Sequence, residues 1–305
     1  MGTTQKVIVI IGPTAAGKTK LAVKLAKKFN GEIVSADSRQ VYRGMDIGTG
    51  KDLADYGKVP YHLIDVILPK THFTVAHWQR KATTAIDDIL KRGKLPIVVG
   101  GTGLYISALV EGYVFPRTQS SKLKAQSFHK ALDTLSLPQL LIRLKKIDPA
   151  TYEIIDKKNR RRVQRALEIF YQTGVTKSAQ LKKQKSPYDF LIFGVTFPKE
   201  KLAKRITQRL YERLDQGMVA EVERLHNQGV SWKRLESLGL EYRFIALYLQ
   251  KKLTYNEMVV QLEKAIKDFA KRQMTWFKRM PNMQWETDSR IAISKVSKFL
   301  SLDNY

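Results

Sequence analysis

A glycine-rich loop at residues 12–19, GPTAAGKT, constrains the fold of this chain more than any other feature of its 305 residues. The loop matches the phosphate-binding pattern G-x-x-x-x-G-K-[ST] at every fixed position. Residues 6–11 before it (KVIVII) form a continuous apolar, mostly β-branched run, which predicts a strand buried on both faces. Residues 18–29 after it place Leu21, Leu25 and Phe29 on one helical face. A strand, a turn and a helix in this order predict a phosphate-binding site.

The residue types of the loop explain how it would hold an anion. Glycines let backbone N–H groups turn inward around phosphate oxygens, and the positive end of the following helix points at the same place. The Lys18 amine adds a positive charge, and the Thr19 hydroxyl can bind Mg²⁺. Kinases, ATPases and transferases that release diphosphate share this device, so the loop alone leaves the reaction open.

Strands and helices alternate along the first part of the chain. Further strands are predicted at residues 32–36, 63–67 and 95–99, and helices at 74–92 and from about residue 104. Residues 117–187 show no strand pattern, 191–197 return to strand composition, and 202–214, 235–249 and 255–280 predict helices. This order predicts an α/β fold, a P-loop NTPase-like parallel sheet flanked by helices, with a helical insertion domain. We expect residues 1–114 and 188–305 to form the catalytic core and residues 115–187 the basic insertion.

The charge of the chain favours an anionic partner. Its 54 Lys and Arg against 28 Asp and Glu give a formal net charge of +26. Residues 117–187 contain 17 Lys and Arg and 5 Asp and Glu, so this span carries +12 of the +26 in 71 of the 305 residues. Nucleic acid, an anionic membrane face or a solubilising surface could account for such a charge.

The absence of cysteine excludes disulfides, thiolate zinc sites and cysteine nucleophiles. The apolar run at residues 7–11 is too short for a signal peptide core or a membrane span. We therefore expect a soluble, cytoplasmic protein with no membrane partner, and a monomer.

Two more motifs follow predicted strands. Asp37 comes directly after the second strand, where it should lie at the carboxyl edge of the sheet near the phosphate loop. The turn at residues 100–103 (GGTG) follows another strand, permits close approach of a ligand and offers the Thr102 hydroxyl. Each motif taken alone also fits an ordinary turn.

Six segments together resemble the tRNA dimethylallyltransferase (isopentenyl transferase) family. They are GPTAAGKT, SADSRQVYRGMDIGT, VPYHLIDV, PIVVGGTGLY, RRRVQRALEIFYQTG and AKRQMTWFKR, and they occur in the family's order over residues 8–279. The second and the last segments are long and distinctive.

The resemblance implies transfer of a dimethylallyl group from dimethylallyl diphosphate to N6 of the adenosine at tRNA position 37, beside the anticodon. It implies Asp37 as the general base, Thr102 at the reacting centre, a catalytic contribution from Lys18, and Mg²⁺ held partly by Thr19. The implied diphosphate-binding residues are Gly12, Pro13, Thr14, Ala15, Ala16, Gly17, Lys18 and Thr19. The implied tRNA-binding residues are Asp37, Ser38, Arg39, Gln40, Arg161, Arg162, Val163, Gln164, Arg165, Lys271, Arg272, Gln273, Trp276 and Lys278.

The chemistry of such a reaction is consistent with these roles. An exocyclic adenine amine is a weak nucleophile, so a nearby carboxylate that takes its proton would assist it. Diphosphate leaves easily only when its charge is neutralised, which backbone donors, Lys18 and Mg²⁺ would do. The base must be extruded from its stack to react, and a single-stranded loop makes this cheaper.

The basic stretch at residues 159–165 (NRRRVQR) has two interpretations. A solvated helix face is the usual one, but four arginines and a glutamine offer planar donors for phosphates and bases, which favours tRNA contact. In the last long helix we expect Met258, Leu262, Ile266 and Phe269 in the core. Trp276 and Phe277 are also more typical of a core than of a stacking platform.

The sequence departs from the family at three places. The family often has two histidines where this chain has Tyr61-His62, and we expect His62 to be structural. It commonly has glycine where this chain has Glu241, which puts any substrate contact there in doubt. It also uses arginines of later helices around the diphosphate, and the sequence does not select among Arg205, Arg209 and Arg213. The zinc finger of some eukaryotic relatives has no counterpart here.

Three alternatives remain at this level. An adenine-nucleotide isopentenyltransferase would share the loop but has no need for the arginine-rich insertion. A small-molecule P-loop kinase would turn over ATP without tRNA. A non-catalytic RNA-binding protein would keep the basic surfaces but not Lys18 and Asp37.

Overall fold

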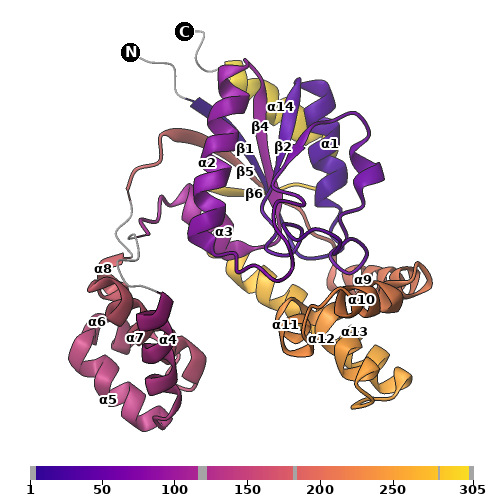
Figure 1. Cartoon of the computed structure of the whole chain (residues 1–305). Helices are drawn as coiled ribbons and strands as arrows, with labels where there is room; N and C mark the ends of the chain where they lie inside the picture. The colour runs from indigo at the N-terminus through magenta and orange to yellow at the C-terminus, as the bar shows by residue number, and fades with distance from the viewer. Residues whose placement is uncertain (1–4, 116–121, 181–183, 281, 302–305) are drawn as a thin grey trace. The chain divides into compact units, whose positions relative to one another are not determined.

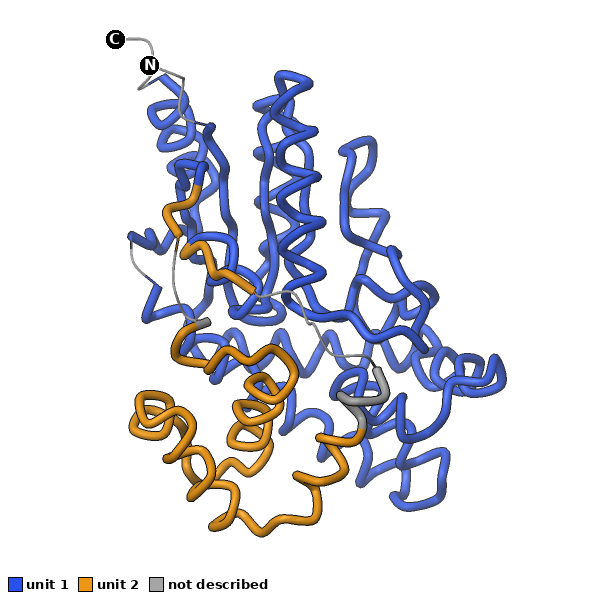
Figure 2. Tube along the Cα trace, turned by 60° about the vertical axis from the view of Figure 1, so that its left-hand side comes forward, with its two compact units in different colours: residues 1–110, 187–305 blue, residues 111–186 orange. Residues whose placement is uncertain are grey.

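The computed structural model of the chain describes residues 5–115, 122–180, 184–280 and 282–301. It contains two compact units, which Figure 2 shows in different colours. Unit 1 comprises Met1–Val110 and Pro187–Tyr305, and unit 2 comprises Glu111–Ser186. Among the helices of the described residues, none combines the length and apolar character that crossing a membrane requires.

Unit 1 is built on a parallel sheet, as the sequence predicts. Its six strands lie in the order β3-β2-β4-β1-β5-β6, and every neighbouring pair is parallel. Because the strands are parallel, their carboxyl ends meet at one edge, where ligands of such sheets bind. The strands are β1 Gln5–Ile11, β2 Gly31–Ser35, β3 Tyr61–His62, β4 Leu95–Gly100, β5 Tyr188–Gly194 and β6 Met283–Trp285.

Helices cover both faces of the sheet, so the central strand β1 is apolar on both sides (Figure 1). Ile8 and Ile10 pack on one side with α1 (Lys18–Lys28) and α14 (Ser289–Ser301). Val7, Val9 and Ile11 pack on the other with α2 (Val75–Lys91) and α3 (Gly103–Val110). Each fully buried side chain of this size stabilises the fold by about 1.5–3 kcal/mol.

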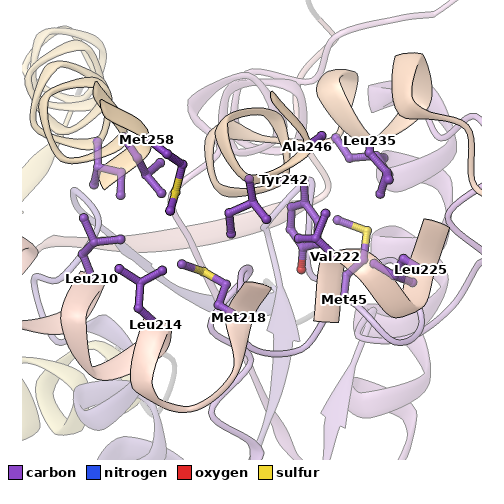
Figure 3. Packing of buried hydrophobic residues seen from close by; sticks show 14 of the residues in the cluster. Met45, Leu210, Leu214, Met218, Val222, Leu225, Leu235, Tyr242, Ala246 and Met258 are labelled. Carbon is purple, nitrogen blue, oxygen red and sulfur yellow. The ribbon is translucent and has the colours of Figure 1, made fainter. Parts of the chain in front are cut away.

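A third apolar cluster joins the later helices of unit 1 to the segment that follows β2. Figure 3 shows Met45 of that segment beside Tyr242, Val222 and Leu225. The helices are α9 Lys199–Asp215, α10 Met218–Asn227, α11 Trp232–Ser237, α12 Leu240–Leu249 and α13 Tyr255–Phe277, with the 3₁₀ turn Leu53–Tyr56 earlier in the chain. Through this cluster the helices meet the carboxyl edge of the sheet.

The regular secondary structure in the described residues of unit 2 consists of helices, and the unit has its own apolar core. Leu132, Leu140, Leu144, Val163 and Leu167 form the centre of that core. The helices are α4 Lys122–Asp133, α5 Leu137–Ile147, α6 Pro149–Ile154, α7 Arg160–Thr173 and α8 Lys177–Gln180.

Several local predictions are wrong. Residues 63–67 do not form a strand, because Leu63 and Asp65 adopt φ angles of 64° and 57° that strand pairing does not allow. The predicted helix at 235–249 is broken at Gly239, which separates α11 from α12. Phe269 and Trp276 are 39% and 42% exposed rather than buried. Strand β6, helix α10 and helix α14 were not expected.

An ion cluster fixes the amino end of β2. The Glu32 side chain is only 2% exposed. Its carboxylate accepts hydrogen bonds from both Arg92 Nη atoms, from Lys94 Nζ at 2.8 Å and from His62 Nε2 at 2.7 Å. These donors tie β2 to β3 and to the residues that lead into β4. Their charge, with Arg92 first, holds the pKa of Glu32 well below its ordinary value of 4.5 against the opposing effect of burial.

Replacing Glu32 by glutamine should lower the free energy of unfolding by about 1–3 kcal/mol at pH 7, because Arg92, Lys94 and His62 lose the buried carboxylate that they share while Arg92 and Lys94 keep some solvent. Since folding lowers this pKa, the stabilisation is complete above pH 4.5 and declines as pH falls below it. Urea unfolding of the wild type and Glu32→Gln between pH 7 and pH 2 should show their difference shrinking with acidity. The exposed Glu223→Gln serves as the control, and a difference that is constant over this range would contradict the account.

Candidate active site

The phosphate loop connects β1 directly to α1. Gly12 has a φ of 154°, and a Cβ there would overlap the Val195 carbonyl, so only glycine fits. Ala15 and Gly17 have φ angles of 61° and 83° and turn the chain back toward the first helical turn. That turn contains no acidic residue, and Gly17 offers no capping side chain. Its amides and the helix dipole therefore favour an anion at this end.

The buried Gln273 of α13 joins the phosphate loop to the glycine turn. Its Oε1 accepts a hydrogen bond from Thr14 N at 2.9 Å, and its Nε2 donates to Gly101 O at 2.8 Å. Both ends of the amide are thus used inside the protein, and the side chain is 7% exposed. Gln273 therefore fixes the distance between two loops of the site rather than presenting an amide to solvent.

Three arginines of α9 line the outer side of the loop at intervals of one helical turn. Arg205 Nε donates to Ala15 O at 2.8 Å, and Arg209 donates to the Thr14 hydroxyl. Arg213 is buried, and its Nη2 lies 3.7 Å from Asp52 Oδ2. Arg205 and Arg209 therefore contact the phosphate loop directly, whereas Arg213 faces the segment after β2. A Cβ on Gly50 would overlap the Arg213 guanidinium, so this guanidinium passes where only glycine leaves room.

The Lys18 amine turns back on its own loop and donates to Pro13 O at 2.7 Å. Burial and, after it, the positive charge of Arg209 lower the pKa of Lys18 to about 8, although the negative charge of Asp37 acts in the opposite direction. The lysine is therefore charged at neutral pH and begins to lose its proton just above it.

Asp37 and Thr102 meet where β2 and β4 end. Ser38 N donates to Thr102 Oγ1 at 3.0 Å, and Thr102 N donates to Ala36 O at 3.2 Å. Asp37 Oδ1 accepts from Arg39 N at 2.8 Å, which turns the chain sharply after the strand. None of the residues that the structure describes donates to its Oδ2, so this oxygen can accept a proton.

A buried carboxylate holds the rest of the segment after β2 in place. Glu221 of α10 accepts hydrogen bonds from the backbone N–H groups of Asp46, Ile47 and Gly48 at 2.7–3.1 Å, and from Tyr242 Oη at 2.6 Å. Nothing in the sequence marks Glu221 for this role, because its partners are backbone amides 173–175 residues away.

Lys51 secures the end of the same segment. Its buried amine donates to Tyr42 O at 2.8 Å and to Asp46 Oδ1 at 2.6 Å, and it pairs with Asp65. The Gln40 amide is also used internally, since Nε2 donates to Gly50 O at 3.0 Å and Oε1 accepts from Ser35 Oγ. A rigid loop therefore carries Asp37, Ser38 and Arg39.

The donors for a metal ion at the loop are few. The described residues contain no group of three or more histidine or acidic side chains that could hold an ion by themselves. Thr19, in the first turn of α1, contributes a hydroxyl. Burial and the negative charges of Asp37 and Asp52 raise the pKa of Tyr56, whose 3₁₀ turn packs against α1, so both carboxylates act in this region. One hydroxyl and one or two carboxylates suit an ion that takes its remaining ligands from substrate phosphates and water, as Mg²⁺ does.

The arginine-rich stretch forms the first turns of α7 in unit 2. Arg161, Arg162 and Arg165 are exposed. Val163 lies in the core of the unit at 0% exposure, and Gln164 is buried and donates to Asp133 Oδ1 at 2.7 Å. The neighbouring Arg160 donates to the last carbonyl groups of α4. Three side chains of the stretch therefore reach solvent, while the others hold the unit together.

The end of α13 alternates between core and surface. Phe277 is fully buried, whereas Lys271, Arg272, Trp276 and Lys278 are exposed. Trp276 lies against Gly103 and donates from Nε1 to Ser107 Oγ at 3.2 Å. Gln273 is thus flanked along the chain by Lys271 and Arg272 on one side and by Trp276 and Lys278 on the other, beside the glycine turn that carries Thr102.

Comparison with known protein families gives a consistent result. The model of the IPP transferase family matches residues 40–280, and that of the isopentenyl transferase family matches residues 5–58. The chain is 48% identical over 274 residues to tRNA dimethylallyltransferase 1 of Geotalea daltonii, covering 90% of this chain and 86% of that protein. It is 43% identical over 302 residues to tRNA dimethylallyltransferase of Anoxybacillus flavithermus, covering 97% and 95%.

Solved structures agree with the sequence relatives. The tRNA isopentenylpyrophosphate transferase of Bacillus halodurans superposes with a TM-score of 0.71 at 35% identity, covering 97% of this chain and 96% of that one. A eukaryotic dimethylallyltransferase acting on tRNA superposes with a TM-score of 0.83 at 29% identity, covering 97% of this chain and 80% of that one.

The pKa of Lys18 predicts how the loop responds to pH. Binding of inorganic pyrophosphate should weaken above about pH 8, because the lysine then loses the charge that attracts the anion. The wild type and Lys18→Met would be compared by calorimetry from pH 6.5 to 9.5, since the ligand's own titration cancels in their difference. The advantage of the wild type should be largest below pH 8 and decline above it. An advantage that does not change with pH would contradict the assignment.

Proposed function

The chain belongs to the IPP transferase family, and on that premise we propose that it transfers a dimethylallyl group from dimethylallyl diphosphate to N6 of adenosine 37 in the anticodon loop of tRNA. The products would be N6-isopentenyladenosine and diphosphate. Relatives that carry the name tRNA dimethylallyltransferase match nine tenths or more of the chain.

One observation supports this function above the others: a phosphate loop and an available carboxylate oxygen share one edge of the sheet. Asp37 lies in the turn that Thr102 holds, and Gln273 ties the glycine turn of Thr102 to the phosphate loop, so a ligand on the loop would have its reacting carbon near the carboxylate. A phosphotransferase would need a carboxylate beside a hydroxyl acceptor. A prenyl transfer needs it beside an amine that must lose a proton.

The residues divide the reaction between them. The adenine N6 attacks the allylic carbon of dimethylallyl diphosphate, the carbon–oxygen bond breaks, and diphosphate leaves. Asp37 Oδ2 takes the proton that N6 gives up, while its Oδ1 stays engaged with Arg39 N. Thr102 holds Ser38 N and so fixes the turn on which Asp37 lies. The carboxylate thus meets the amine without having to reorganise.

The leaving diphosphate faces concentrated positive charge. Lys18, Arg205 and Arg209 contact the loop from two sides, and the amides of its first helical turn add further donors. Mg²⁺, held by Thr19 and the phosphate oxygens, would neutralise more of the leaving charge. Arg205 and Arg209 already hydrogen bond the loop, so part of the ordering cost is met before the substrate arrives.

The tRNA would be held mainly through its phosphates and through its unpaired bases. Arg161, Arg162 and Arg165 supply exposed guanidinium groups for the phosphates. Lys271, Arg272 and Lys278 supply cations beside the exposed Trp276. A free adenine nucleotide has no phosphate backbone to engage two such surfaces, which favours a tRNA substrate over a nucleotide.

Replacing Asp37 by asparagine tests the general base. Asparagine keeps an oxygen for Arg39 N but cannot take the proton, so the single-turnover rate of prenyl transfer should fall by roughly 10²–10⁴-fold. The Kd for tRNA should stay within about two-fold of the wild type. Mass analysis of the nucleosides from tRNA mixed with dimethylallyl diphosphate measures the product. A normal rate with impaired tRNA binding would overturn the role of Asp37.

Replacing Arg161 and Arg165 by glutamine tests the phosphate contacts. The affinity for tRNA should fall, and the slope of log K against log salt should decrease by about one per lost contact. Arg143→Gln with Lys146→Gln is the matched control, because both side chains are exposed on α5 of the same unit. Equal salt slopes for the wild type and the α7 variant would show that α7 does not touch the nucleic acid.

A further inference from the structure

A carboxylate lies among the arginines that border the phosphate loop. Glu241, in the first turn of α12, lines a pocket together with Arg209 and Arg213 of α9. The rest of that lining is apolar and comes from Ile206, Leu210, Met218 and Ile266. Since Arg209 also donates to the Thr14 hydroxyl, the pocket adjoins the phosphate loop itself.

Glu241 does not form a conventional salt bridge. Within the described part of the chain it makes no direct ion pair, and the hydrogen bond to its carboxylate comes from its own backbone. Arg213 and Arg209 attract it across the pocket, and Asp37 repels it. Burial in this apolar lining raises the pKa of Glu241, which means that the ionised form of its side chain is destabilised.

The arginines need such a charge when no anion is bound. Burial and the neighbouring Arg213 lower the pKa of Arg209 to about 10, although the negative charges of Glu241 and Asp52 act in the opposite direction. Two guanidinium groups that destabilise each other are thus balanced by carboxylates across the pocket. A bound diphosphate would supply several negative charges at the same guanidinium groups.

We propose that Glu241 is a resident counter-charge for Arg209 and Arg213 that limits how tightly the enzyme holds diphosphate. It stabilises the arginines in the empty site and repels the diphosphate once this occupies the loop. The inference rests on the proposed function, because it takes the phosphate loop as the diphosphate site. Its consequence is easier release of the product, at the expense of affinity for the substrate.

Replacing Glu241 by glutamine should therefore tighten the binding of inorganic pyrophosphate by roughly 3- to 10-fold. This is the effect expected when one negative charge is removed near the ligand in partly solvated protein. The KM for dimethylallyl diphosphate should fall by a similar factor. The ligand-free variant should melt at a lower temperature than the wild type, because the arginines lose their counter-charge. Saturating pyrophosphate should raise the melting temperature of the variant more than that of the wild type.

Two further variants separate charge from shape. Glu241→Asp keeps the charge and should bind pyrophosphate within about two-fold of the wild type, since the interaction acts at long range. Glu263→Gln removes the same charge from α13, where Glu263 accepts from Thr207 of α9, and should leave the affinity unchanged. Equal or weaker binding by Glu241→Gln, or equal tightening by all three variants, would overturn the proposal. A wild-type protein that does not bind pyrophosphate would instead refute the proposed function.

Discussion

The site depends on the two hydrogen bonds of one buried amide. Gln273 Oε1 accepts a hydrogen bond from Thr14 N and its Nε2 donates one to Gly101 O, which couples the phosphate loop, the glycine turn and helix α13. These segments are distant in sequence, and without the amide two buried backbone groups would lose their partners. The same helix carries the exposed Lys271 and Arg272 just before Gln273 and the exposed Trp276 one turn after it. One rigid element therefore holds the phosphate loop, the glycine turn and this exposed surface of α13 in place.

The positive side chains around the phosphate loop are opposed by only a few carboxylates. Lys18, Arg205, Arg209 and Arg213 surround the loop, and three of them reach it through direct hydrogen bonds. The carboxylates that face them serve different ends. Asp37 has an oxygen free of partners among the described residues, whereas Glu221 is fully engaged with the backbone and with Tyr242. A carboxylate with an oxygen that has no partner can bind a substrate or accept a proton, whereas a fully hydrogen-bonded carboxylate stabilises the fold.

Local pattern was enough to predict the sheet, the phosphate loop and the motifs at its edge, because those features follow from short-range chemistry. The loop needs its glycines, and Asp37 and Thr102 each follow a buried strand. The roles of Glu221, Gln273 and Lys51 could not be predicted, because their partners are mainly backbone groups that only the folded chain brings near. The sequence predicted a helix for the arginine-rich stretch, but it did not predict which face of this helix would be buried. Val163 and Gln164 consequently became core residues, although family resemblance had grouped them with the exposed arginines.

The order of the strands in the sheet has a consequence for how this protein is made. The central strand β1 pairs with β4 on one side and with β5 on the other, and β5 begins only at Tyr188. A ribosome working from the first codon must therefore finish all of unit 2 before β1 can gain its second neighbour. Unit 2 is continuous in sequence and contains its own apolar cluster, so it can fold during that interval. Until then one edge of the apolar strand β1 stays unpaired in the nascent sheet. An unpaired strand edge can pair with another chain, so the nascent protein is prone to aggregation at this stage.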